Sequence, residues 1–184
     1  MAFDLGSLLQ QYIGGASAPL QHAQDHFDQA SQSASTDLLS TGLAAMFRSD
    51  ATPAFGQMAG QLFGQANSSQ QAGMLNQLIA GMGPAVLASL LNKGGSGGGG
   101  VLGSLGGLLG QLTSGGGTPT LTPAQASTLT PEQVQVIASR AEQSNPGIID
   151  QMSSFYAEHP TLVKTVGAAA LSIALAKMAE HSRA

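Results

Sequence analysis

The fold is decided by the stretch PAFGQMAGQLFGQANSSQQAGMLNQLIAGM, residues 53–82. Its apolar residues recur every three or four positions, which is the spacing of one face of an α-helix. In the first half these residues are Phe55, Met58, Ala59, Leu62, Phe63 and Ala66. In the second half they are Met74, Leu75, Leu78, Ile79 and Met82. Asn67 and Ser68 mark a turn between them, so the stretch predicts two consecutive amphipathic helices.

Local signals set the ends of the second of these helices. Ser68 and Gln71 have the spacing of a capping box, in which each side chain accepts a backbone N–H at the helix start. Gly83 and Pro84 break the helix, and another short one begins at Ala85. The short connections allow neighbouring helices to pack antiparallel.

Three further helices are predicted before Pro53. The first covers residues 5–13 with Asp4 as its cap, the second begins near Pro19, and the third begins at Thr36. Together with the stretch above they form a predicted N-terminal helical unit over residues 1–93. Its polar faces carry glutamine where Lys and Glu usually lie.

Residues 94–120 differ in composition from everything before them. A glycine run from Gly94 to Gly100, interrupted only by Ser96, has the composition of a flexible linker. A Leu/Gly segment follows and closes at Gly115–Gly117. Because each glycine inside a helix costs about 1 kcal/mol relative to alanine, this segment orders only by packing on something else.

The last third again shows clear helix signals and is predicted as a three-helix unit over residues 121–184. Thr130, Pro131 and Gln133 supply a capping threonine, a proline at the first helical position and a capping-box glutamine. That helix ends at Asn145–Pro146, the next ends at His159–Pro160, and the last runs from about Thr161 to the end. We find no alternating strand pattern, so the predicted fold class is all-α: two small helical units joined by a Gly-rich segment.

Composition excludes several classes of function. Only 9% of the 184 residues are charged and the net charge is −4, so six scattered Lys and Arg residues form no basic patch for nucleic acid. The absence of cysteine excludes a disulfide scaffold and any Cys-based site. The first basic residue is Arg48, and the apolar stretch from Thr165 to Ala176 is too short to span a bilayer. We therefore expect a cytoplasmic protein, with export by a route that reads no cleavable signal left open.

Catalytic templates are missing, and we predict that the protein is not an enzyme and binds no cofactor. The sequence has no G-x-S-x-G elbow, no Walker lysine motif and no H-E-x-x-H. The glycine run Gly94–Gly100 follows a predicted helix rather than a strand, which argues against a phosphate loop.

Two histidines are the only candidates for a metal site. His22 and His26 lie at i, i+4 and project from one helix face, the spacing at which two imidazoles can share a metal ion. No motif places a third ligand. An ordinary polar surface helix explains the same residues, and we favour it, so no metal site is predicted.

The C-terminal helix has two interpretations. Ala168, Ser172 and Ala176 recur every four residues, and Ala170 and Ala174 form a parallel row. Small residues at this spacing let two helix backbones approach closely. We favour a core helix covered by the helices of residues 131–158. Two short partners cover an all-round apolar helix poorly, which keeps self-association or membrane insertion open.

Two families share local features with the chain. Residues 101–112, VLGSLGGLLGQL, followed by Leu129-Thr130-Pro131-Glu132-Gln133, resemble the small bacterial YidB-like proteins of unknown function. That resemblance implies a cytoplasmic helical protein with no assigned activity. The glycine-rich, cysteine-free composition is similar to that of harpins, which plant-associated bacteria export. No catalytic or binding residue carries over from either family.

These observations favour a non-enzymatic helical interaction or self-assembling protein of bacterial origin. Its partner would be a second copy or another protein, with no nucleic acid and with a membrane surface as a less favoured possibility. We expect two contact faces: the stripe of Phe55, Met58, Leu62 and Phe63, and the row of Ala168, Ser172 and Ala176. The alternative is a secreted or membrane-active effector of harpin-like or bacteriocin-like type.

Overall fold

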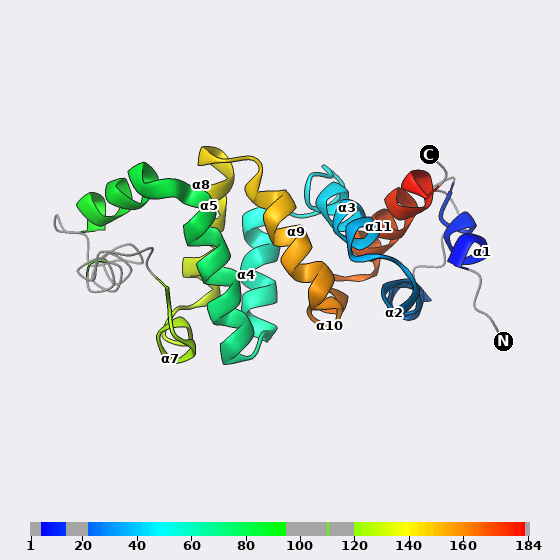
Figure 1. Ribbon diagram of the computed structural model, residues 1–184, viewed down its shortest axis with the longest axis horizontal. Helices are drawn as coiled ribbons and strands as arrows, with labels where there is room; N and C mark the ends of the chain where they lie inside the picture. The colour runs from blue at the N-terminus through cyan, green and yellow to red at the C-terminus, as the bar shows by residue number, and fades with distance from the viewer. Residues whose placement is uncertain (1–4, 14–21, 95–109, 111–119, 183–184) are drawn as a thin grey trace. The chain divides into compact units, whose positions relative to one another are not determined.

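Figure 1 shows the computed structural model of the chain, and each regular element of its described residues is a helix. The structure describes residues 5–13, 22–94, 110 and 120–182. Within these ranges there is no β-strand. The predicted all-α class is therefore confirmed.

The chain divides into two compact units, and one of them joins the two ends of the sequence. It consists of residues 1–58 and 149–184. Its described helices are α1 (Leu5–Gln10), α2 (Ala23–Ser33), α3 (Thr36–Phe47), α10 (Pro160–Val163), the 3₁₀ turn η2 (Lys164–Val166) and α11 (Ala168–His181), with most of α9 (Ile148–Glu158). The C-terminal helix α11 packs on α3, α2 and α1, most extensively on α3 (Figure 1).

Close contact between α3 and α11 depends on one glycine. A β-carbon added to Gly42 would lie 2.8 Å from the carbonyl oxygen of Ala174 and 2.5 Å from Cγ of Met178. Only a residue without a side chain fits at this point. Leu39, Leu43 and Met46 continue the buried face of α3 around it.

Polar contacts join other helices of this unit. The Tyr12 hydroxyl lies 2.7 Å from Nδ1 of His26, which links the turn after α1 to α2. Lys164 pairs with Asp28, and the Gln24 amide donates a hydrogen bond to the Lys164 carbonyl oxygen, 3.1 Å away. The 3₁₀ turn before α11 is thereby attached to α2.

The other unit consists of residues 59–148. It contains the larger part of α4 (Phe55–Gln65), together with α5 (Ser68–Gly94), α7 (Pro123–Ala126) and α8 (Pro131–Ser144). Helix α5 packs on both α7 and α8 (Figure 1). The Asn76 side chain accepts the backbone N–H of Leu121 at 2.7 Å and donates to its carbonyl oxygen at 3.2 Å.

This division differs from the boundaries expected at residues 93 and 121. From the sequence, residues 121–148 are predicted to belong to a C-terminal unit, whereas α7 and α8 pack on α5. Helix α11 is predicted to be covered by residues 131–158, whereas it packs on α1, α2 and α3. The pairings of α11 join helices more than a hundred residues apart in the sequence. Periodicity carries no information about which helices pack together. The predicted linker, residues 94–120, lies outside the described residues except for Gly94, Gly110 and Thr120.

Several predicted helix ends are confirmed. Thr130 and Gln133 form the capping box at the start of α8, with Pro131 at the first helical position. Helix α8 ends at Ser144, just before Asn145–Pro146, and α9 ends at Glu158, just before His159–Pro160. The break in α5 is also present, because Gly83 has a φ of 71°. The predicted cap residue Asp4 lies outside the described residues.

Two predicted helix features are wrong. The capping pair at the start of α5 is Asn67 and Gln70, one residue before the expected Ser68 and Gln71: Asn67 Oδ1 accepts the Gln70 N–H, and Gln70 Oε1 accepts the Asn67 N–H. The final helix is not continuous from Thr161, because Gly167 has a φ of 112° and separates η2 from α11. An L side chain rarely adopts that φ, so glycine sets the break.

None of the helices in the described residues is both long enough and apolar enough to cross a membrane.

Candidate functional site

The stripe expected as a contact face on α4 is buried. Phe55, Met58, Leu62 and Phe63 each expose 1% or less of their surface. The ring of Phe55 packs edge-on against Phe47, with 5.4 Å between the ring centroids. These four side chains belong to the hydrophobic core, so we do not carry them forward as an interaction surface.

The second expected face, on α11, is partly exposed. Ala168, Ser172 and Ala176 are half-buried, whereas Ala170 and Ala174 are buried against the rest of the unit. Successive residues on a helix are 100° apart, so the two rows lie on different sides of α11. The Ser172 hydroxyl donates to the Ala169 carbonyl oxygen at 2.7 Å, which leaves its donor satisfied inside the helix.

The two histidines lie at the start of α2. Their ring centroids are 6.0 Å apart, and Nδ1 of His26 takes part in the hydrogen bond with Tyr12. His22 lies 3.9 Å from the Asp25 carboxylate. Across the described ranges, no three His, Cys, Asp or Glu side chains group in a way that could hold a metal ion.

A hollow of about 470 Å³ lies between α3 and α9. Its lining residues are Ser40, Thr41, Ala44, Ala45, Arg48, Asp150 and Ser154. Arg48 donates two hydrogen bonds to the Asp150 carboxylate, at 2.9 and 2.8 Å, and this partner raises the pKa of Arg48.

The hydroxyls of this hollow are engaged in their own helices. Ser40 and Thr41 both donate to the Asp37 carbonyl oxygen, at 2.9 and 2.8 Å, and Ser154 donates to that of Asp150 at 3.1 Å. A nucleophile needs its hydroxyl directed at a general base, and these three hydroxyls are directed at backbone carbonyls instead. The hollow is therefore lined by an ion pair and by small side chains whose hydroxyls are bonded within their own helices.

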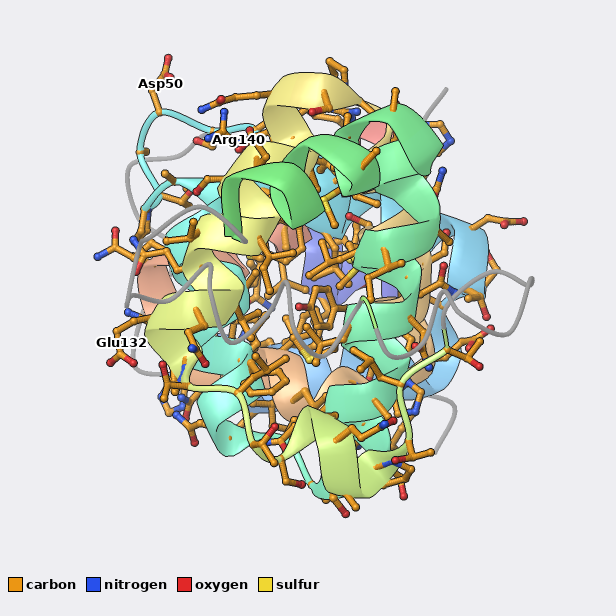
Figure 2. The ribbon with its side chains drawn as sticks, turned by 90° about the vertical axis from the view of Figure 1, so that its left-hand side faces the viewer. Asp50, Glu132 and Arg140 are labelled. Carbon is orange, nitrogen blue, oxygen red and sulfur yellow. The ribbon has the colours of Figure 1, made fainter. Side chains whose placement is uncertain are left out.

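The solvent face of α8 is a surface that the sequence analysis missed. Val136 exposes 39% of its surface, which is high for a branched apolar side chain. Gln135, Ser139, Arg140 and Gln143 line a shallow hollow of about 260 Å³ with it. Figure 2 labels Glu132 and Arg140 on this helix, and the Glu132 carboxylate points outward. A valine opposite the apolar face of an amphipathic helix is the signal that could have indicated this surface.

Glu132 is held ionised at the start of α8. Its carboxylate accepts hydrogen bonds from its own backbone N–H and from the Thr130 hydroxyl, and both lower its pKa. The N-terminus of a helix favours a negative charge in the same way. The exposed face of α8 therefore carries a fixed anion at Glu132 and a cation at Arg140.

Two buried hydroxyls lie on α9 without a hydrogen-bond partner among the described residues. These are Ser153 Oγ and Tyr156 Oη. Burial raises the pKa of Tyr156 far above its usual value. The Tyr156 ring packs on Phe47 of α3, with 5.5 Å between the centroids, so its role is to fill the core.

No protein-family model matches the chain, and comparisons with curated proteins and with solved structures find no similar protein. The resemblances to the YidB-like proteins and to the harpins stay predictions.

Proposed function

We propose that the chain is a non-enzymatic helical protein that assembles with copies of itself, and that α11 provides one contact. It would act in the bacterial cytoplasm, as the resemblance to the YidB-like proteins implies. Its partner is a second copy of the chain, with no nucleic acid.

The observation that carries this proposal is the pair of small-residue rows on α11. The row of Ala170 and Ala174 is buried, and at Ala174 the backbone of α11 approaches that of α3 closely at Gly42. The row of Ala168, Ser172 and Ala176 has the same four-residue spacing and is half-exposed. Small side chains on this second row allow a helix of another copy to approach α11 in the same way.

Low charge supports association between like molecules. The net charge of −4 is spread over a chain in which 9% of the residues are charged. Electrostatic repulsion between copies is therefore weak. The three residues of the half-exposed row are themselves uncharged, and the ion pair of Lys177 with Glu180 follows at the end of the row.

The test introduces bulk into the row and measures the mass in solution. Ala168→Leu and Ala176→Leu place branched side chains where the second copy approaches, and we expect the mass measured by light scattering to fall towards 18.4 kDa. Ala124→Leu makes the same change at an exposed alanine of α7 and should leave the mass unchanged. Equal masses for wild type and both row variants would contradict the role of α11.

A further inference from the structure

The buried face and the exposed face of α8 carry different kinds of residue. Its core face carries Val134, Ile137, Ala138 and Ala141, each exposing 2% or less. At 100° per residue, Val136 lies nearly opposite the centre of that face. Val136 therefore lies outside the buried core face of α8, with 39% of its surface exposed.

Charges of opposite sign lie one turn to either side of this valine. Glu132 precedes Val136 by four residues, and Arg140 follows it by four. At 1.5 Å per residue the two charged positions are about 12 Å apart along the helix, which is too far for a direct ion pair. Among the described residues neither side chain has an ion-pair partner within 4.0 Å.

The arrangement of Glu132, Val136 and Arg140 is self-complementary: a two-fold axis brings opposite charges of two copies together. When two copies of α8 lie antiparallel with the axis at Val136, each residue faces the residue equally far on the other side of 136. Val136 then meets Val136 of the second copy. Glu132 meets Arg140 of the second copy, and Arg140 meets Glu132. A two-fold interface requires this kind of self-complementary surface.

From this relationship we infer that the solvent face of α8 is a self-association surface on which two copies pair antiparallel about Val136. The second copy is the favoured occupant because the charges match in both directions at once, and a partner with a single sign of charge would satisfy only one of them. This inference rests on the proposed self-association and adds a contact distinct from α11. The hydroxyl of Ser139 and the amides of Gln135 and Gln143 provide an uncharged polar rim.

Charge reversal tests the pairing directly. Glu132→Arg places two Arg–Arg contacts in the symmetric pair, and Arg140→Glu places two Glu–Glu contacts there. We expect each variant alone to raise the dissociation constant about tenfold at low salt, because two attractive contacts become repulsive. Glu142→Arg makes the same change in charge elsewhere on α8 and should leave the dissociation constant close to the wild-type value.

Mixing the two variants separates pairing from folding. A Glu132→Arg copy and an Arg140→Glu copy together regain both attractive contacts, so their equimolar mixture should recover the wild-type dissociation constant in sedimentation-velocity analysis. The double variant carrying both reversals should recover it as well. A variant that simply fails to fold cannot be rescued in this way.

The possible outcomes distinguish this inference from the proposed function. Wild-type self-association with no effect of either reversal would overturn the pairing through α8 and leave the α11 contact standing. Loss in both variants without recovery in the mixture would also overturn it. A wild-type chain that stays at 18.4 kDa would instead contradict the proposed function itself.

Discussion

Gly42 on α3 and Ala174 on α11 bring two helix backbones into direct contact, since a β-carbon at Gly42 would lie 2.8 Å from the Ala174 carbonyl oxygen. The two residues are separated by most of the chain. Their contact holds the C-terminal helix on the N-terminal helices and completes the unit formed by residues 1–58 and 149–184.

Gly42→Ala should therefore destabilise this unit. The new methyl group meets a backbone oxygen, which cannot move without shifting α11, and overpacking of this kind costs about 1–3 kcal/mol. The gain in helix propensity recovers at most about 1 kcal/mol. Urea denaturation followed by circular dichroism measures the loss. Thr41→Ala, at the exposed neighbouring position, should change the free energy of unfolding by less than about 0.5 kcal/mol.

Asn76→Ala should destabilise the unit of residues 59–148. The Asn76 side-chain amide forms hydrogen bonds with both the backbone N–H and the carbonyl oxygen of Leu121. Removing the amide leaves these two part-buried backbone groups without their Asn76 partner. We expect the free energy of unfolding to fall by about 1–3 kcal/mol. Gln77→Ala, at an exposed position on the same helix, is the matched control. Equal unfolding midpoints for the two variants would show that the Asn76 contact contributes little.

Loss of the hydroxyl should destabilise the protein at Tyr12 but not at Tyr156. Tyr12 lies 2.7 Å from Nδ1 of His26, so Tyr12→Phe removes a hydrogen bond and should cost about 1 kcal/mol. Tyr156 buries its hydroxyl without a partner among the described residues, so Tyr156→Phe should leave stability unchanged or raise it. Thermal unfolding of both variants in the same buffer measures these changes. A large fall in stability in Tyr156→Phe would mean that the Tyr156 hydroxyl makes a hydrogen bond.

Tyr156 also gives stability a dependence on alkaline pH. Burial raises its pKa in the folded chain, whereas the unfolded chain releases the proton near pH 10. Above about pH 10 the unfolded state therefore binds fewer protons than the folded state, and stability falls as pH rises. Urea midpoints at about pH 8 and about pH 11 should differ less in Tyr156→Phe than in wild type. The loss of stability that remains at high pH in Tyr156→Phe would include a contribution from Tyr12, because burial also raises the pKa of Tyr12.

The positions of the helices could be predicted from the sequence better than the contacts between them. The spacing of Phe55, Met58 and Leu62 identifies a helix and its buried side, because a helix face is a local property. The capping box of Thr130 and Gln133 is local in the same way. The contact of Gly42 with Ala174 depends on which distant helices meet, and no local pattern specifies that. A glycine amid the leucines of a predicted helix is nevertheless a usable signal, since it weakens the helix unless close packing requires it.

The same limit applies to the interaction surfaces. The stripe on α4 was predicted as a contact face because an apolar face indicates burial without saying by what, and the chain itself buries it. Val136 was overlooked because one apolar residue on a polar face has no periodicity. The signal is instead its combination with Glu132 and Arg140, four residues to either side, opposite the buried face of α8.

The most direct test of self-association is the mass of the purified wild-type chain in solution, measured by light scattering coupled to size exclusion over a range of concentrations. We predict a discrete multiple of 18.4 kDa that dissociates on dilution. A mass of 18.4 kDa at every concentration would contradict it.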